Sequence, residues 1–438
     1  MNGLLLLLSS CTVSAFIKGR QEPSLSDSRN ENSINSAVGV SRYLYQGDIA
    51  ITKAQYDEIT GNRRGKRSVV RNRMARKWKM PVPFTFDDNF PYNERPAIHD
   101  AMKFWSEKTC VAFQENPNAR QRINIVRSEG CWSFVGRQPM RVQPLSLEPS
   151  CTNHKFVIAH ELAHTLGVFH EHARSDRDKY IDVDFSNLDP KMSYSFLKEE
   201  QRQIDDLNTR YEYGSVMHYA VDQFARNPRK PVMYPKLPDF AQTMGNRMRA
   251  SFQDISRMND LYDCHYICRN TVNRCYMGGY PNPRDCSTCV CPDGFGGDFC
   301  ELPEPASIGQ KSNPSCGGIL WATSKPASMF GAVRTRVHSN NFLSEPEFCF
   351  WHIRAPKGRK IKLTIDKIVT PCSMSCTFNA LELKLGDFGL TGKRFCCDEH
   401  IYQHDGRPKV FETDEHYAVI GAYARYDYLE FDISYYAV

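Results

Sequence analysis

The spacing of apolar residues predicts a mixture of helices and strands in the first 262 residues and strands alone near the end of the chain. Three segments have the pattern of helices, namely residues 96–109, 154–166 and 251–262. Gly167 would end the second helix, and Ser251 is a suitable N-cap for the third. Short β-type runs occupy residues 82–86, 111–113, 123–126, 360–368, 381–385 and 428–433. The change to strands alone indicates a separate β-rich module.

The first residues have the pattern of an export signal. Residues 4–8 are five leucines, a run too short to span a bilayer, which needs about 20 apolar residues. Residues 13–15, Val-Ser-Ala, form a cleavage site of the secretory type, so we predict a signal peptide over residues 1–15. Residues 16 to about 40 are rich in Ser, Asn and Glu and are expected to be loose. The sequence therefore predicts a secreted, extracellular protein without a membrane span.

The cysteines point to the same compartment. The chain has 438 residues, enough for about two to four modules, and 17 cysteines. Cys11 lies in the signal peptide, and most of the others come after residue 260. The even number that remains favours a disulfide framework in an oxidising compartment. A zinc-ribbon protein is the alternative, but only residues 286–289 have the Cys-x-x-Cys form.

The basic residues are concentrated in one segment of a chain whose formal charge is +6. Arg63 to Lys79 contains nine Lys and Arg residues and no acidic residue. Such a run is usually solvated or cleavable, so we predict no nucleic-acid partner. We expect a processing protease of the secretory pathway to cut between Arg67 and Ser68, because the cluster at residues 63–67 follows a signal peptide. A plain basic linker is the alternative.

The strongest candidate for chemistry is residues 160–171, HELAHTLGVFHE. His160 and His164 are four residues apart, so they share one helix face and can bind one Zn²⁺. Gly167 lets the chain turn back, and His170 can then supply a third ligand. Three protein ligands leave one position open for water, which is typical of catalytic zinc sites, and Glu161 would be the general base. A structural zinc site would need a fourth protein ligand instead.

The extended motif resembles that of the metzincins, and Glu171 directly after the third histidine resembles the astacin family. Residues 215–219, Ser-Val-Met-His-Tyr, are similar to the Met-turn of that family. The resemblance covers about residues 69–264 and implies an α+β fold with two lobes on either side of a substrate cleft. It implies that Met217 forms a hydrophobic floor beneath the zinc. By the same resemblance, Tyr219 would bind the zinc in the resting enzyme and later stabilise the oxyanion.

Residues 45–49, Tyr-Gln-Gly-Asp-Ile, lie upstream of the basic cluster. Gly-Asp is a common turn pair, which is the simpler interpretation. In astacins, a propeptide motif of aromatic-x-Gly-Asp delivers a carboxylate to the zinc, and the resemblance implies this role for Asp48. An anionic oxygen suits Zn²⁺, and Gly47 permits close approach of the backbone. After cleavage, the new N-terminus would lie near Glu171 by the same resemblance.

The resemblances also imply disulfides and C-terminal modules. The astacin family implies the pairs Cys110–Cys264 and Cys131–Cys151. The next cysteines resemble an EGF-like module, which implies the pairs Cys268–Cys286, Cys275–Cys289 and Cys291–Cys300. Residues 316–438 are similar to a CUB domain, a β-sandwich with Cys316 and Cys349 as disulfide cysteines. The pairing of four further cysteines stays open, namely Cys372, Cys376, Cys396 and Cys397. Asn379 stands where calcium-binding CUB domains carry Asp, which argues against calcium.

These observations predict a secreted zinc-dependent endopeptidase, with one Zn²⁺ per catalytic domain, that acts on extracellular or matrix proteins and is made as a zymogen. Its predicted parts are a signal peptide (1–15), a propeptide (16–67), an astacin-like domain (68–264), an EGF-like module (265–301), a linker (302–315) and a CUB domain (316–438). The alternative is an extracellular binding protein with a catalytically weak protease domain. The presence of both Glu161 and Tyr219 favours the enzyme.

Overall fold

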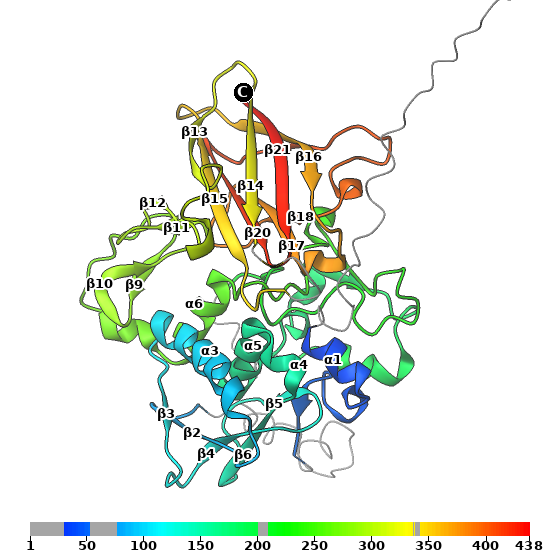
Figure 1. The fold of residues 1–438 in the computed structure, drawn as a ribbon, viewed down its shortest axis with the longest axis vertical. Coiled ribbons are helices and arrows are strands. Elements are labelled where there is room, and N and C mark those ends of the chain that lie inside the picture. Colours follow the sequence, from blue (N-terminus) through cyan, green and yellow to red (C-terminus); the bar gives the residue numbers. More distant parts are fainter. Residues whose placement is uncertain (1–29, 53–76, 200–208, 336, 338–341) are drawn as a thin grey trace, which may run out of the picture.

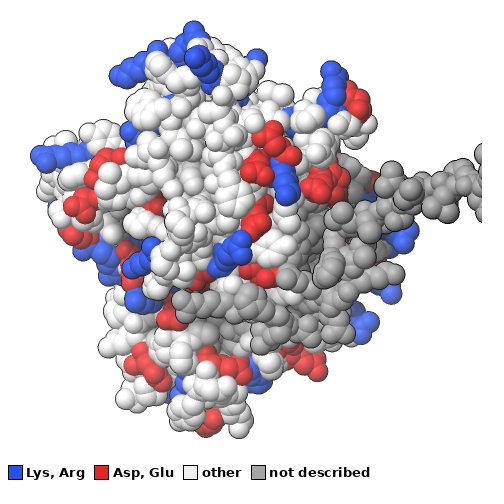
Figure 2. Space-filling model, turned by 45° about the horizontal axis from the view of Figure 1, so that its top comes forward, with Lys and Arg blue, Asp and Glu red and all other residues white. Residues whose placement is uncertain are grey.

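The protein is described by a computed structural model of residues 30–52, 77–199, 209–335, 337 and 342–438 (Figure 1). The predicted signal peptide and the Arg67–Ser68 cleavage site lie outside the described residues. A mixed helix and sheet domain lies at one end of the molecule, a β-sandwich at the other, and a small disulfide-rich unit beside their junction (Figure 1). None of the helices among the described residues has the length and apolar character needed to cross a bilayer. Basic and acidic side chains are interspersed on the face shown in Figure 2.

One six-stranded sheet, in the order β1-β5-β6-β4-β2-β3, supports the mixed domain. Its strands are β1 (Ile49–Ala50), β2 (Val82–Phe86), β3 (Phe113–Glu115), β4 (Arg122–Val126), β5 (Cys131–Phe134) and β6 (Val142–Leu147). β5 and β6 are antiparallel, and the other neighbours are parallel. The strand predicted at residues 111–113 was placed too early, because pairing with β2 begins with Phe113 opposite Val82. The edge strand β1 comes from the segment upstream of the basic cluster.

Helices pack on this sheet around one apolar core. They are α3 (Arg95–Lys108), α4 (Pro149–Thr152), α5 (Lys155–Leu166) and α6 (Phe252–Leu261). The predicted stripe of Ile98, Met102 and Trp105 is buried, and the Trp105 indole N–H donates to the carbonyl of Ala159 in α5 (3.1 Å). Gly167 ends α5 at a φ of 116°, which a residue with a Cβ would resist. The pattern therefore located the three long helices to within about two residues.

The second lobe of this domain has little regular structure. It contains the two-stranded sheet of β7 (Ile181–Val183) and β8 (Met233–Pro235). Short 3₁₀ turns lie at Glu171–Ala173, Arg177–Lys179, Pro190–Phe196 and Pro238–Phe240. A separate cluster of aromatic and methionine side chains, which includes Tyr211, Tyr219 and Met244, forms its core. Helix α5 thus lies in one lobe, and Tyr219 in the other.

Part of the N-terminal segment is ordered, although residues up to about 40 were expected to be loose. Helix α1 (Glu31–Ala37) and a 3₁₀ turn (Ser41–Tyr43) precede β1. The Asn30 side chain caps α1 by accepting the N–H of Ser33 (2.9 Å). A seven-residue helix shows almost no periodicity and is too short to be stable alone, so tertiary contacts must hold it. Asn35 supplies such contacts, because its side chain bonds both the N–H and the carbonyl of Cys131 on β5 (2.7 and 2.6 Å).

The disulfide-rich unit consists of two small hairpins. The strands are β9 (Tyr280–Asn282), β10 (Asp285–Val290), β11 (Phe295–Gly296) and β12 (Leu302–Pro303), after a 3₁₀ turn at Cys264–Cys268. Its disulfides join Cys268 to Cys286, Cys275 to Cys289 and Cys291 to Cys300. In the mixed domain, Cys110 is joined to Cys264 and Cys131 to Cys151. These are the pairs that the family resemblances implied.

The β-sandwich packs a five-stranded sheet, β13-β15-β20-β17-β18, against a four-stranded sheet, β14-β21-β16-β19. The strands are β13 (Gly318–Trp321), β14 (Ala327–Arg334), β15 (Glu347–Arg354), β16 (Ile361–Val369), β17 (Asn379–Lys384), β18 (Lys393–Phe395), β19 (Val410–Glu412), β20 (Tyr417–Ala424) and β21 (Tyr428–Ala437), with 3₁₀ turns at Ile308–Gln310, Met374–Cys376 and Asp398–His400. Cys316 is joined to Cys349. The pairs left open are Cys372–Cys397 and Cys376–Cys396.

Asn379 is a structural residue of this sandwich. Its amide donates to the hydroxyl of Thr370 and to the carbonyls of Tyr426 and Tyr428 (2.7–3.0 Å). Its carbonyl oxygen accepts the N–H of Arg425 (3.0 Å). The side chain is buried and fully engaged, so it holds two loops of the sandwich together.

His352 joins the sandwich to the disulfide-rich unit. Its buried ring bonds the hydroxyl of Tyr417 through Nδ1 (2.5 Å) and the carbonyl of Gly294 through Nε2 (2.8 Å). The carbonyl can only accept, so Nε2 carries the proton and Nδ1 accepts from the tyrosine. Burial lowers the pKa of His352 to about 4.

This histidine predicts an acid-sensitive contribution to stability. Its pKa is about 4 in the folded chain and about 6.5 in the unfolded chain, so the unfolded state binds more protons between these values. The contribution, up to about 3 kcal/mol, is present above pH 6.5 and is lost as the pH falls to 4. We expect the free energy of unfolding of His352→Gln to fall less than that of the parent chain between pH 7 and pH 4, as measured by urea unfolding. Equal losses in both proteins would contradict the prediction.

Candidate active site

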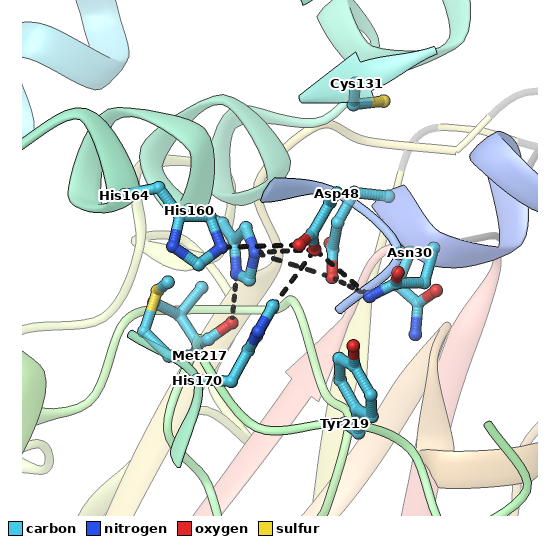
Figure 3. Close-up of polar contacts among 12 residues, drawn as sticks. Asn30, Asp48, Cys131, His160, His164, His170, Met217 and Tyr219 are labelled. Atoms are coloured by element: carbon cyan, nitrogen blue, oxygen red, sulfur yellow. Dashed lines mark hydrogen bonds and ion pairs between the residues drawn. The ribbon is translucent and has the colours of Figure 1, made fainter. Parts of the chain in front are cut away.

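Three buried imidazoles converge between the two lobes (Figure 3). His160 and His164 lie on α5, and His170 follows the turn at Gly167. Each Nδ1 faces an acceptor at 2.7–2.8 Å. The acceptor is the Val216 carbonyl for His160 and the Val168 carbonyl for His164. For His170 it is the side-chain oxygen of Gln46. These contacts place the proton on Nδ1 and leave the Nε2 lone pairs directed to one point. Burial lowers the pKa of His170 to about 4, which keeps this ring neutral.

The carboxylate of Asp48 lies at that point. Its Oδ2 is 3.3 Å from Nε2 of His160 and 3.1 Å from Nε2 of His170, and its Oδ1 is 3.6 Å from Nε2 of His164. One ligand atom from each of the four residues lies within 4.8 Å of the others. Neither the lone pairs nor the carboxylate can donate, and Asp48 Oδ1 and His164 Nε2 are buried without hydrogen-bond partners among the described residues. A cation must compensate this cluster of acceptors, and three imidazoles with one carboxylate form a donor set that suits Zn²⁺.

Glu161 is the second unpartnered acid of the centre. It is fully buried in α5, one residue after the first histidine, and neither carboxylate oxygen has a hydrogen-bond partner in the part of the chain that the structure describes. Burial, and then the negative charges of Asp48 and Glu31, raise the pKa of the Glu161 carboxyl well above its usual value. A carboxyl whose proton affinity is raised in this way is suited to accept and return a proton.

The turn at residues 215–219 lies beneath the histidines (Figure 3). Asp254 on α6 fixes it by accepting the hydroxyl of Ser215 (2.5 Å) and the N–H of Val216 (2.8 Å). The same aspartate completes a capping box with Ser251 at the start of α6. The Val216 carbonyl is thereby held on His160, and Met217 is buried in the core below the rings. One acid thus supports both the helix start and the orientation of a histidine.

Tyr219 contacts the N-terminal segment in this structure. Its hydroxyl donates a short hydrogen bond to the backbone carbonyl of Gln46, and its ring stacks on His172 with centroids 3.7 Å apart. The hydroxyl is therefore near the centre, while Asp48 occupies the fourth position around it. The zinc contact predicted for Tyr219 in the resting enzyme stays a prediction for the chain without this segment.

Residues 45–49 form a tight turn that presents Asp48. The backbones of Tyr45 and Ile49 exchange two hydrogen bonds (2.8 and 2.9 Å). Gly47 has a φ of 78°, and a Cβ there would lie 2.0 Å from Oδ1 of Asn32, so no other residue fits. The Tyr45 hydroxyl donates to Glu199 (2.7 Å), and Ile49 pairs with Ser133 on β5. The turn is thus held at both ends by the mixed helix and sheet domain.

Sequence reasoning missed a second acid in the N-terminal segment. Glu31 is fully buried, and its Oε1 lies 3.7 Å from Nε2 of His160. Arg247 donates to both of its oxygens (2.9 and 2.6 Å), and although burial opposes ionisation, the charge of Arg247 helps to lower the pKa of Glu31 to about 2. The Asn-Glu pair at residues 30 and 31 has the composition of a helix start, the only local signal available. Nothing in the sequence pairs it with Arg247, which is 216 residues away.

Glu171 is buried and already has partners in the uncut chain. Arg257 on α6 lies 2.5 Å from one carboxylate oxygen, and the N–H of Glu212 donates to the other (2.9 Å). Although burial opposes ionisation, the charge of Arg257 lowers the pKa of Glu171. The predicted pairing with a new N-terminus involves residues around 68, which lie outside the described residues.

The sequence of the mixed domain matches a known family. Residues 70–263 match the model of the astacin peptidase family. The chain is 59% identical over 411 residues to zinc metalloproteinase nas-27 of Caenorhabditis elegans, and the match covers 94% of each chain. The chain belongs to the astacin family. Its zinc metalloendopeptidase activity and its single zinc ion follow from this membership and from the donor set of three histidines and Asp48.

Two further relatives of this astacin are similar over different lengths. Zinc metalloproteinase nas-28 of C. elegans is 32% identical over 410 residues, which cover 91% of this chain and 80% of the relative. Among solved structures, high choriolytic enzyme 1, a hatching enzyme zinc-protease of medaka (Oryzias latipes), is 32% identical with a TM-score of 0.41. That match covers 45% of this chain and 98% of the medaka chain.

The donor set predicts how this astacin holds zinc. We expect one zinc ion per chain in the purified protein. His164→Ala should lower the zinc affinity by at least about 100-fold, because the two remaining imidazoles cannot complete the site. His265→Ala is a matched control, since His265 is partly exposed and pairs with Asp260 (2.9 Å) away from the centre. Competition with a zinc-binding dye measures both variants, and retention of full affinity by His164→Ala would contradict the assignment.

Proposed function

We propose that this astacin is a secreted endopeptidase that cleaves extracellular or matrix proteins and is made as a zymogen silenced by Asp48. The eight disulfides of the described residues support an oxidising compartment, as does the predicted signal peptide. The contact of Asp48 with all three histidines carries the proposal of silencing. We further propose the disulfide-rich unit (265–301) as an EGF-like module and the sandwich (316–438) as a CUB domain, on their cysteine pattern and two-sheet fold.

The N-terminal segment supports silencing by two kinds of contact. Asp48 occupies the position that a catalytic centre leaves open. Strand β1 adds to the edge of the sheet, with Ile49 opposite Ser133 and Ala50 opposite Phe134 on β5. Removal of the segment would expose the backbone groups of β5, which an extended substrate could then bind by strand addition. The segment therefore competes with substrate both at the centre and along the cleft.

The chain's own residues have distinct roles in the proposed mechanism. His160, His164 and His170 would hold the zinc, which when bound polarises a carbonyl oxygen and lowers the pKa of water. Glu161 takes a proton from the attacking water and passes it to the nitrogen of the leaving amine. Tyr219, released from the Gln46 carbonyl, donates a hydrogen bond to the oxyanion. The presence of all these groups favours an active enzyme over a binding protein with a weak protease domain.

Two substitutions test the silencing and the base together. In the uncut chain, Asp48→Ala should raise the rate of peptide cleavage at least about tenfold, because it frees the fourth position at the histidines.

Glu161→Gln should lower the rate of the trimmed enzyme by at least about 100-fold while the zinc content stays at one per chain. A fluorogenic peptide and the uncut and trimmed chains supply the measurements.

The control for silencing is Asn35→Ala, which removes the contact with Cys131 but keeps Asp48. It should activate the uncut chain less than Asp48→Ala does. If Asp48→Ala stays as silent as the parent chain, Asp48 is not the silencing ligand. If Glu161→Gln retains the parent rate, Glu161 is not the base.

The Glu31–Arg247 pair suggests which substrates the cleft prefers. Arg247 is buried, and its other hydrogen bonds among the described residues go to the backbone carbonyls of His218 and Asn246. When the segment leaves, the guanidinium loses its carboxylate in a low-dielectric site. A substrate with an acidic side chain close to the scissile bond would restore that pair.

We therefore compare peptides with Glu or Gln close to the scissile bond, at the place whose side chain would meet Arg247. The trimmed enzyme should cleave the Glu peptide at least about tenfold more efficiently than the Gln peptide. Arg247→Gln should abolish the difference in kcat/KM while the enzyme still cleaves the Gln peptide. A preference that persists in Arg247→Gln would assign the acid specificity to another residue.

A further inference from the structure

A cavity of about 280 Å³ lies where three parts of the chain meet. Its walls include Asn30 and Ser33 of the N-terminal segment and Arg247 of the catalytic domain. The sandwich contributes Met374, Ser375, Thr377 and Arg425 to the same cavity. The 3₁₀ turn Met374–Cys376 therefore faces a space that the propeptide and the catalytic domain share.

Arg247 links this cavity to the active centre. Arg247 lines the cavity and also holds Glu31, which is 3.7 Å from Nε2 of His160. Asn30 precedes Glu31 directly and donates to Gln223 of the catalytic domain (3.3 Å). The first turn of α1 thus lies between the histidines and the cavity that the sandwich also lines.

The sandwich is fixed against the catalytic domain at this place. The Asn246 amide donates to the carbonyls of Ser375 and Cys376 (3.2 and 3.4 Å), directly beside Arg247. Met248 is fully buried in one cluster with residues of the sandwich, among them Phe350 and Cys376. Arg425 reaches across to His154 at the start of α5 (2.7 Å). A surface held by such contacts keeps a constant position relative to the zinc-binding histidines.

The turn itself is preset for contact. Ser375 and Cys376 both have positive φ values, 53° and 46°, and two neighbouring disulfides hold the turn in this conformation. The Ser375 hydroxyl is buried without a hydrogen-bond partner among the described residues, while Met374 is 48% exposed. The turn therefore offers an apolar thioether to a ligand in the cavity, and the unpartnered Ser375 belongs to the cavity wall.

We propose that the sandwich forms one wall of the substrate cleft and that Met374, Ser375 and Thr377 bind the part of a polypeptide substrate that extends past Arg247. The proposal rests on the proposed function, because it assigns an extended substrate to the path that residues 30–33 occupy in the uncut chain. The sandwich then selects substrates by direct contact near the scissile bond. A short peptide that ends at Arg247 would not reach this wall.

Peptides of different length test this wall. The trimmed full-length enzyme is assayed with a short peptide and with two longer peptides, one extended by four residues at its amino end and the other at its carboxyl end. We expect one extension to raise kcat/KM about fivefold or more over the short peptide. Met374→Ala combined with Thr377→Ala should remove this gain and leave kcat/KM for the short peptide unchanged.

The control variant is Phe330→Ala. It alters an exposed residue on β14 of the four-stranded sheet and should keep the full gain. A gain that survives the double substitution, or the absence of any gain in the parent enzyme, would overturn the proposal. Cleavage of the short peptide would still support the proposed function in either case. If no peptide were cleaved by the trimmed parent enzyme, the proposed function itself would fail.

Photo-crosslinking provides a second readout that is independent of rates. The extended peptide that shows the gain in kcat/KM carries a benzophenone side chain at its extended end. It is bound to the trimmed Glu161→Gln variant, which should not cleave it. We expect the crosslink in the fragment that contains residues 374–377, located by mass spectrometry. A crosslink confined to the catalytic domain would overturn the proposal.

Discussion

The structure depends on one electrostatic requirement at its centre. Three imidazole lone pairs and the carboxylate of Asp48 face one another in a buried space, and none of these four groups can donate to another. Such a cluster of acceptors is stable only around a cation. The surrounding contacts follow from it, since each Nδ1 must have an acceptor if Nε2 is to face the metal. The carbonyls of Val216 and Val168 are two of these acceptors, so the backbone after α5 and the backbone of the 215–219 turn are positioned by the same requirement.

Several local features of this centre could be predicted because one helix and one turn contain them. The spacing of His160 and His164, the stop at Gly167 and the return to His170 depend only on helix geometry and on the freedom of glycine. The capping box of Ser251 and Asp254 was equally local. Its contact with the turn at Ser215 was not predictable, because that contact joins residues 39 positions apart.

The remaining features depend on contacts between distant segments. Helix α1 carries no periodic signal in seven residues. Its order comes from the bonds of Asn35 with Cys131 on β5 and from the pair of Glu31 with Arg247. The strand β1 has two residues and exists only as a neighbour of β5. The pairing of the four cysteines in the sandwich depends on how the loop between β16 and β17 lies beside the end of β18, which spacing does not determine. Sequence therefore predicts the ligands well and their distant partners poorly.

The charges of the N-terminal segment also explain how a single cut could release it. While the chain is continuous, Asp48 and Glu31 are held beside the histidines at a high effective concentration. In the proposed zymogen, a cut between Arg67 and Ser68 would turn the segment into a separate chain, whose affinity for the centre would then depend on its own contacts alone. Removing it leaves Arg247 buried without its acid, which opposes release, but a substrate carboxylate can take the same place. In the proposed function, the buried pair would therefore favour exchange of the propeptide for an acidic substrate over simple loss of the propeptide.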